Sequence, residues 1–165
     1  MQAPSKESGG ETSPVDEHVR AMIAALREAG LRVTPQRVAV CRALAESKTH
    51  PTAQALFEQL SAQFASQFAT FSRATVYNTL ETLARMGLAQ QLVVTGDGAM
   101  RFDSNLAPHA HLVCTRCHRV EDYADPALAH TVADVSRRSG YELRGLCVFY
   151  HGLCPQCQAQ TAANS

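Results

Sequence analysis

Hydrophobic residues recur every three or four positions in four stretches of the first half of the chain, the spacing that places them on one helix face. Thr34, Thr52 and Ser72 are typical N-caps, and Gly30 and Gly87 are typical of positions just beyond a helix end. The pattern predicts helices over residues 15–29, 35–46, 53–64 and 73–86. Their expected buried residues are Val19, Met22, Ile23 and Leu26; Val38, Cys41 and Leu44; Leu56, Phe57 and Leu60; and Val76, Leu80 and Leu83.

The second half of the chain has shorter apolar stretches separated by turns. Strands are predicted over residues 90–95, 99–103, 110–114, 119–123 and 141–150, and a helix over 126–139 with Leu128, Val132 and Val135 on its buried side. The first two strands flank Gly96-Asp97-Gly98, so a hairpin follows the fourth helix, as in the wing of a winged helix. The pattern therefore predicts an α+β fold. Its parts are a disordered tail (1–14), a winged-helix DNA-binding domain (15–103) and a small α/β dimerisation domain (104–165), whose strands offer an edge to a second copy.

Composition narrows the choice of compartment and partner. The chain has no long apolar run and no basic, apolar leader, which predicts a cytoplasmic protein without a membrane span. The net charge is zero, and residues 17–103 hold nine Lys or Arg against seven acidic residues. So weak a basic balance means that DNA binding would depend on the placement of a few arginines, and on a dimer that doubles the phosphate contacts.

Two C-x-x-C pairs predict a structural zinc site. Cys114 and Cys117 form the first pair and Cys154 and Cys157 the second, and four thiolates suit closed, tetrahedral zinc. The alternatives are four reduced buried thiols or a redox-active pair, as in a thiol oxidoreductase, but redox pairs occur singly at a helix start. The remaining two cysteines, Cys41 and Cys147, are expected to be buried and unreactive.

Two further groups of polar residues are candidates for binding. His109 and His111 lie two apart in a predicted strand, so their rings project from one face and form a second ligand pair. On the fourth helix the outward residues combine groups that reach phosphates with groups that read bases. They are Arg73, Thr75, Tyr77, Asn78 and Glu81, and the first four are our candidate DNA contacts. A solvated helix face is the alternative, although the capped helices and the hairpin favour DNA.

Several of these motifs, in the same order, resemble those of the ferric uptake regulator family. They are residues 32–37 (RVTPQR), 50–53 (HPTA), 74–80 (ATVYNTL), 101–103 (RFD) and 109–111 (HAH), together with the two C-x-x-C pairs. The resemblance extends from about Val15 to Cys157. It implies a homodimeric, metal-dependent winged-helix repressor that binds double-stranded operator DNA. It also implies structural zinc in the C-terminal domain and a regulatory metal between the domains.

Within that family the chain is most similar to the peroxide-sensing branch. The resemblance assigns the regulatory Fe(II) or Mn(II) to His50, Asp103, His109, His111 and Asp122, and this donor set suits those ions. Glu121 is the neighbour that could replace Asp122. Iron-sensing members tend to carry Glu at these two Asp positions and Arg at the position of Asn78. The resemblance further implies that peroxide, reacting with bound Fe(II), oxidises His50 or His109 to 2-oxo-histidine.

Other functions are possible for the same residues. A manganese, iron or zinc uptake repressor of this family is the main alternative, and a small metallohydrolase or oxygenase is a weaker one. Five protein ligands nearly saturate an ion and leave little room for substrate, so we do not expect an enzyme. Many iron and zinc sensors of the family carry a His before the second C-x-x-C pair that completes a third metal site. Residues 144–147 contain no His here, although His151 lies nearby, so the resemblance does not imply a third site. We expect His18, His118, His130 and His151 to be surface residues.

Overall fold

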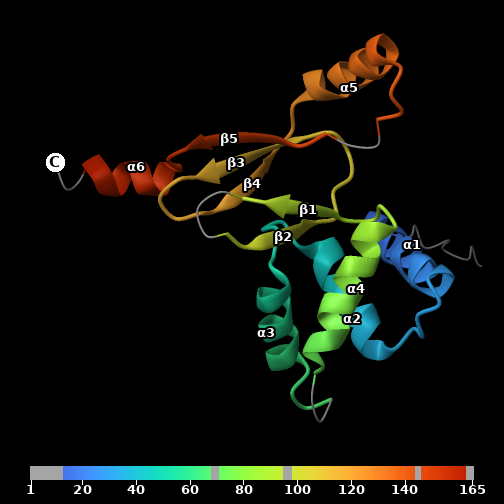
Figure 1. Cartoon of the computed structure of the whole chain (residues 1–165). Helices are drawn as coiled ribbons and strands as arrows, with labels where there is room; N and C mark the ends of the chain where they lie inside the picture. Colours follow the sequence, from blue (N-terminus) through green and yellow to red (C-terminus); the bar gives the residue numbers. More distant parts are fainter. Residues whose placement is uncertain (1–12, 68–70, 95–97, 144–145, 163–165) are drawn as a thin grey trace, which may run out of the picture.

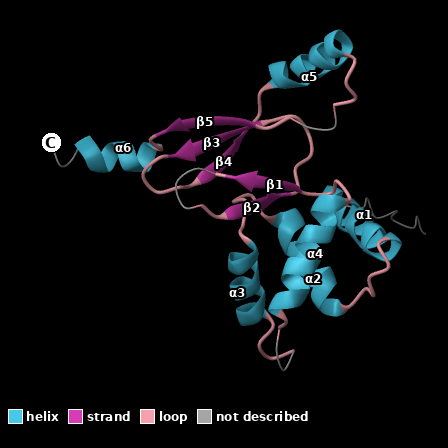
Figure 2. Ribbon diagram, in the orientation of Figure 1, coloured by secondary structure: helices cyan, strands magenta, loops and turns pink. Residues whose placement is uncertain are grey.

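The computed structural model describes residues 13–67, 71–94, 98–143 and 146–162, and it has the predicted α+β architecture (Figures 1 and 2). Four helices come first, followed by a two-stranded hairpin and a three-stranded sheet. The elements are α1 (Pro14–Glu28), α2 (Pro35–Glu46), α3 (Ala53–Gln63), α4 (Arg73–Arg85), β1 (Gln90–Val93), β2 (Met100–Asp103), β3 (Ala110–Cys114), β4 (Val120–Tyr123), α5 (Pro126–Ser139), β5 (Val148–Gly152) and α6 (Pro155–Ala162).

The predicted helix caps are all formed. The side chains of Thr34, Thr52 and Ser72 each accept a hydrogen bond from the backbone amide three residues later, at 3.3, 3.0 and 3.3 Å. Helix α1 begins at Pro14, one residue inside the predicted tail, because proline is favourable at the first helical position. The rest of that tail, residues 1–12, lies outside the described residues.

The main core lies among the first four helices, with α4 packed against α1, α2 and α3. Val76, Leu80 and Leu83, the predicted inner face of α4, have no exposed surface. Most of the other expected core residues are also buried, whereas Ile23, Val38 and Phe57 are only partly so. Val40 is fully buried but was not predicted, because α2 contacts helices on more than one side and a single apolar stripe understates its burial.

The hairpin is tied to the helices at the start of α3. Strands β1 and β2 are antiparallel, with Gln91 opposite Phe102. The Phe102 amide donates to the Pro51 carbonyl at 3.0 Å, and Thr52 forms a bridge with Arg101. The strands are shorter than predicted, and most of the predicted turn lies in residues 95–97, outside the described part. The wing is thereby held beside the connection between α2 and α3.

The C-terminal sheet has the strand order β4-β3-β5, antiparallel between β3 and β4 and parallel between β3 and β5. The strand predicted over 141–150 is wrong at its start, since β5 covers only Val148–Gly152. Its length is set by pairing with β3, whereas Tyr141 and Leu143 upstream are exposed. Helix α5 has its predicted bounds but projects away from the sheet (Figure 1). Its predicted buried side is therefore only partly correct, with Leu128 buried and Val135 47% exposed.

A small apolar cluster joins the hairpin to the C-terminal sheet. Leu92 and Val94 from the hairpin side pack with Val113 and Val120 of β3 and β4, and Phe149 of β5 packs against them. This packing places the end of β2 beside β3, which positions the ligand cluster described below. The domain boundary between residues 103 and 104 stays a prediction. Among the described helices, none is long and apolar enough to cross a bilayer.

Candidate metal centres

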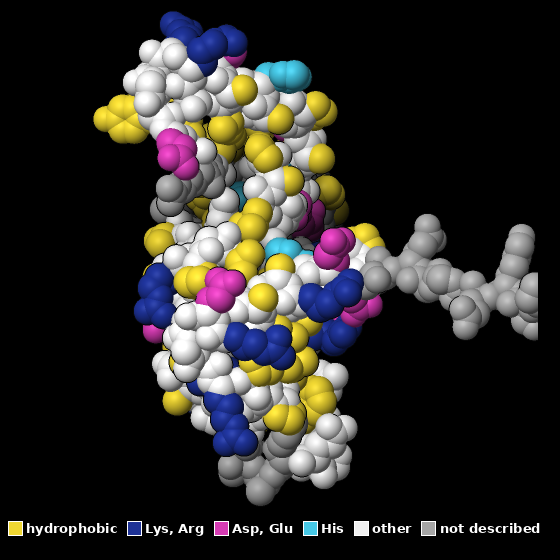
Figure 3. All heavy atoms as spheres, turned by 90° about the vertical axis from the view of Figure 1, so that its right-hand side faces the viewer, with side chains coloured by type: hydrophobic (Ala, Val, Ile, Leu, Met, Phe, Trp, Pro, Cys, Tyr) yellow, Lys and Arg dark blue, Asp and Glu magenta, His cyan; other side chains and the backbone are white. Residues whose placement is uncertain are grey.

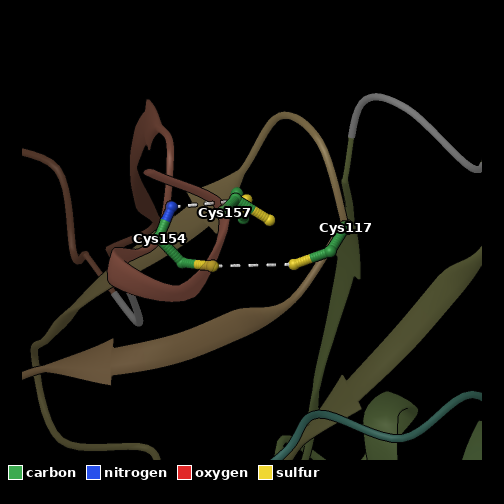
Figure 4. Close-up of side chains that lie close together, drawn as sticks. Cys117, Cys154 and Cys157 are labelled. Carbon is green, nitrogen blue, oxygen red and sulfur yellow. Dashed lines mark hydrogen bonds between the residues drawn. The ribbon is translucent and has the colours of Figure 1, made fainter. Parts of the chain in front are cut away.

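The four C-x-x-C cysteines converge between the end of β3 and the start of α6. Cys114 ends β3, Cys117 follows in the adjoining turn, and Cys154 and Cys157 lie beside or within the first turn of α6. Figure 4 shows the side chains of Cys117 and Cys154 directed at each other, with their sulfurs 3.8 Å apart. The Cys154 amide donates to the Cys114 sulfur at 3.4 Å, and this bond is the largest of several backbone contacts that lower the pKa of Cys114 to about 5.

This sulfur geometry fits a tetrahedral metal ion. With Zn–S bonds of about 2.3 Å, two sulfurs of a tetrahedral site lie about 3.8 Å apart. All four thiols are free of disulfide bonds, and their sulfurs lie within 4.8 Å of one another. Burial raises the pKa of the Cys157 thiol to about 12, so in the absence of a cation one of the four favours its neutral form. The set suits zinc better than a redox pair, which needs only two sulfurs.

A second cluster brings together residues from separate segments of the chain. His50 precedes α3, Asp103 ends β2, His109 immediately precedes β3, His111 lies within β3, and Asp122 lies opposite His111 on β4. One ligand atom of each residue lies within 4.8 Å of all the others. His50 has a φ of 49°, and such left-handed backbone in a non-glycine residue is concentrated at functional sites. The structure thus gathers all five residues that the resemblance assigned to the regulatory metal.

The distances in this cluster match those of ligands around one ion. His109 Nε2 lies 3.0 Å from His111 Nε2 and 3.2 Å from both Asp103 Oδ2 and Asp122 Oδ1. His50 Nε2 lies 2.7 Å from Asp122 Oδ1 and 3.8 Å from Asp103 Oδ2. At metal–ligand bonds of about 2.1 Å, ligands at right angles are separated by about 3.0 Å. Three imidazoles and two carboxylates could therefore share a divalent cation.

Burial and hydrogen bonding hold His50 and Asp103 in the protonation states that bind metal. Burial lowers the pKa of His50, which keeps its imidazole neutral. Burial alone would raise the pKa of Asp103, but hydrogen bonds from His111 and from the Asn105 amide outweigh it and lower that pKa. The Asn105 amide binds Oδ1 of Asp103 at 2.7 Å, which leaves Oδ2 for the cluster.

One histidine of the cluster has its tautomer set by the backbone. His109 Nδ1 lies 2.7 Å from the Ala107 carbonyl, so Nδ1 carries the hydrogen and donates it. The lone pair is then on Nε2, which faces the cluster. Ligand histidines are commonly oriented in this way by a partner on their second nitrogen. The Nδ1 atom of His111 is buried with no partner among the described residues.

The alternation of side chains along β4 shows that Asp122, and not Glu121, faces the histidine cluster. Asp122 is opposite His111 in the β3–β4 register, whereas Glu121 is opposite Leu112 on the other face and pairs with Arg119 at 3.3 Å. Sequence reasoning missed Phe149, whose ring lies 5.3 Å from that of His111. Phe149 is opposite His111 in the parallel pairing of β5 with β3. The hydrophobic periodicity of the sequence does not reveal which residues of two strands are paired, so it could not indicate this contact.

Several expectations about other residues need correction. Cys41 is fully buried as predicted, but Cys147 is exposed, because it lies just before Val148, where the pairing of β5 with β3 begins. His130 and His151 are exposed, whereas His18 and His118 are half-buried. Among the described residues, His151 belongs to neither ligand cluster.

The outward face of α4 carries the candidate DNA contacts. Arg73, Tyr77 and Asn78 are exposed and Thr75 is half-buried. The Arg73 guanidinium stacks 4.8 Å above the ring of Phe57 on α3. Residues of α3, α4 and the hairpin, among them Tyr77, border a cavity of about 350 Å³. Figure 3 views the molecule from the right-hand side of Figure 1. On this face the Lys and Arg side chains of the lower, helical half are scattered rather than gathered in one patch, in keeping with the weak basic balance of residues 17–103.

The fold and the two clusters define a class: a winged-helix protein joined to a small sheet, with two clusters of residues that could hold metal ions. Residues 28–150 match the model of the Ferric uptake regulator family, and the chain belongs to this family of metal-responsive transcription regulators.

Individual relatives agree with this assignment. The chain is 33% identical over 148 residues to the peroxide-responsive repressor PerR of Staphylococcus aureus, covering 90% of this chain and 97% of that protein. The ferric uptake regulator of Helicobacter pylori, described with three functional metal binding sites, has a TM-score of 0.68 at 20% identity, covering 88% of this chain and 95% of its own. A zinc uptake regulator complexed with zinc and DNA has a TM-score of 0.57 at 21% identity, and the match covers 92% of this chain and 99% of that one. The two structures establish a shared fold only.

Proposed function

We propose that the protein is a homodimeric, Fe(II)- or Mn(II)-dependent repressor that binds double-stranded operator DNA and senses hydrogen peroxide. The observation that carries this proposal is the composition of the His/Asp cluster. His50 comes from the helical half of the chain, Asp103 from the end of the hairpin, and His109, His111 and Asp122 from the C-terminal sheet side. An ion bound by all five would tie the DNA-binding half to the sheet.

Such a split ligand set explains how metal could control DNA binding. A ligand shifts a conformational equilibrium only through its different affinities for the two states. When the helical half and the sheet separate, His50 moves away from His109, His111 and Asp122, so the ion favours the closed arrangement. In a dimer, that arrangement would hold two α4 helices at half-site spacing, with Arg73, Thr75, Tyr77 and Asn78 toward the major groove.

The peroxide response would follow from ligand chemistry. Fe(II) held at the cluster would supply the redox chemistry that activates hydrogen peroxide, and the two electrons that reduce the peroxide would come overall from an imidazole. His50 or His109 would take up one oxygen atom to become 2-oxo-histidine, with water as the other product. The altered ring is a poor ligand, so the ion and the DNA would be released. The likeness to a peroxide-responsive repressor at 33% identity supports this step.

The cluster of four cysteines is proposed to hold structural zinc through Cys114, Cys117, Cys154 and Cys157. Four thiolates leave no open coordination position, which suits a structural rather than a catalytic role. The ion would join α6 to the end of β3. Dimerisation through the C-terminal half is supported by the 47% exposure of Val135 on α5 and by the unpaired outer edge of β5 among the described strands.

The main alternative is a metal-uptake repressor, since regulators of iron and zinc uptake share this fold. The experiment uses zinc-loaded protein and a DNA site selected from a random pool. Binding is measured with Fe(II) or Mn(II), before and after a low dose of hydrogen peroxide, together with mass spectrometry of the peptides holding His50 and His109. Peroxide sensing predicts loss of binding only with Fe(II), with one added oxygen on either residue. Undiminished binding with unmodified histidines favours the uptake repressor.

A further inference from the structure

Arg116 lies between the two cysteines of the first C-x-x-C pair and reaches across to α6. Its Nη1 donates to the Cys157 carbonyl at 3.3 Å and to Thr161 Oγ1 at 3.2 Å. Thr161 Oγ1 in turn donates to the same Cys157 carbonyl at 2.9 Å. One guanidinium thus contacts the first turn and the last turn of the helix that carries half of the cysteine cluster.

Helix α6 is a short helix at the end of the described chain. It has eight residues, and isolated helices of that length are not stable in water. Among residues 155–161, whose burial is described, only Cys157 is buried. Apart from the cysteines, Arg119 supplies the second tether, since its Nη2 donates to Gln156 Oε1 at 3.0 Å. Arg116, within the first C-x-x-C pair, and Arg119, two residues after it, therefore both hold α6 from the side of β3.

The same arginines also offset charge. A divalent ion with four thiolates has a formal charge of −2, which favours nearby cations. Arg119 interacts electrostatically with Cys154 and Cys117. Arg116 lies beside the carbonyl of Cys157, the most buried of the α6-side ligands. The positions of both guanidinium groups suit a negatively charged metal–thiolate centre.

We propose that Arg116 is a positioning residue for the zinc centre: by bridging Cys157 and Thr161 it locks α6 against the first C-x-x-C pair and slows the loss of zinc. The inference rests on the proposed zinc centre. Release of the ion requires the two cysteine pairs to separate, and the Arg116 bridge must break for α6 to move. Groups that orient metal ligands commonly change metal affinity by about 10- to 100-fold when removed.

The test measures zinc release from the full-length protein into an excess of a chromophoric chelator. Arg116→Gln is expected to release zinc about tenfold faster than the native chain. Arg116→Lys keeps the charge but has a shorter side chain that reaches less far toward α6, so it should also release zinc faster, though by a smaller factor. Arg138→Gln, an exposed arginine of α5, is the matched control and should release zinc at the native rate.

Two outcomes overturn the inference, and they are distinguishable. If the purified native protein contains no stoichiometric zinc, the zinc centre itself fails and Arg116 has no such role. If zinc is present but Arg116→Gln releases it at the native rate, the zinc centre stands and only the role of Arg116 is rejected. Circular dichroism before chelator is added verifies that the variants are folded.

Discussion

His50 Nε2 lies 2.7 Å from Asp122 Oδ1, although the two residues belong to the helical half and to the C-terminal sheet. Replacing either residue by alanine should weaken binding of the regulatory metal and remove the effect of that metal on DNA binding. His50→Ala is expected to weaken Mn(II) binding at least about tenfold, because one buried ligand is removed. Calorimetric titration of the zinc-loaded variant measures this. His130→Ala, on the exposed side of α5, should bind Mn(II) as the native protein does. Equal Mn(II) affinity of His50→Ala and the native chain would exclude His50 as a ligand.

The stability of the protein without the regulatory metal should depend on pH through His50. Burial lowers its pKa from the ordinary value of 6.5, although the charges of Asp103 and Asp122 oppose the shift. Between the lowered value and 6.5 the unfolded chain binds more protons than the folded one, so the free energy of unfolding rises with pH. The stabilisation is present above pH 6.5 and is lost as pH falls through the lowered pKa.

Urea unfolding on both sides of pH 6.5 tests this sign. The native chain should lose more stability on acidification than His50→Gln, which cannot gain the proton. An identical pH dependence in the two proteins would mean that His50 is not the group responsible. Mn(II) affinity should fall over the same range, because protons compete with the ion for the imidazole.

The six cysteines should differ sharply in reactivity. Burial raises the pKa of Cys41 to about 12 and the residue has no exposed surface, whereas Cys147 is exposed. In the zinc-loaded protein N-ethylmaleimide should modify Cys147 first, with Cys41 modified only after unfolding. Mass spectrometry of labelled peptides gives the order. After zinc is removed, Cys117, which is exposed, should become reactive as well. Labelling of Cys41 as fast as that of Cys147 would contradict the structure.

The stacking of Arg73 on Phe57 should contribute to DNA affinity. Arg73→Ala is expected to weaken binding on all sequences and to reduce the slope of log K against log salt by about 0.9 for each phosphate that the variant can no longer neutralise. Phe57→Leu should leave that slope intact but weaken binding by about 0.5–1 kcal/mol per protomer, since the guanidinium is no longer held. Fluorescence anisotropy over a salt series measures both quantities.

Arg137→Ala serves as the control for this series, because Arg137 lies on α5 and pairs with Asp134. It should change neither affinity nor slope. An Arg73→Ala variant with the native slope would remove Arg73 from the phosphate contacts. Normal affinity in Phe57→Leu would mean that the stacking has no part in positioning Arg73.

The parts of the fold that depend on local signals were predictable from the sequence. Thr34, Thr52 and Ser72 mark helix starts by their own hydrogen bonds, and the spacing within each C-x-x-C pair is itself the signal for a thiolate site. The limits of β5 and the exposure of Val135 and Cys147 depend instead on which elements pair with or cover them.

The His/Asp cluster was only partly predictable from chemistry. Strand alternation places His109 and His111 on one face, and their rings are indeed 4.5 Å apart. His50 and Asp103 lie in other segments, and nothing in their spacing indicates that they approach the strand. Their assignment depended on family resemblance, because tertiary packing alone brings them together.

The most direct test of the account is the coupling between the metal and DNA. Mn(II) affinity is measured for the zinc-loaded protein alone and when saturated with its selected DNA site, and DNA affinity is measured with and without Mn(II). Linkage requires DNA to tighten Mn(II) binding by the same factor as Mn(II) tightens DNA binding. We predict a factor of at least about ten, falling close to one in Asp122→Ala. Equal Mn(II) affinity with and without DNA would contradict control through the shared His50 and Asp122 site.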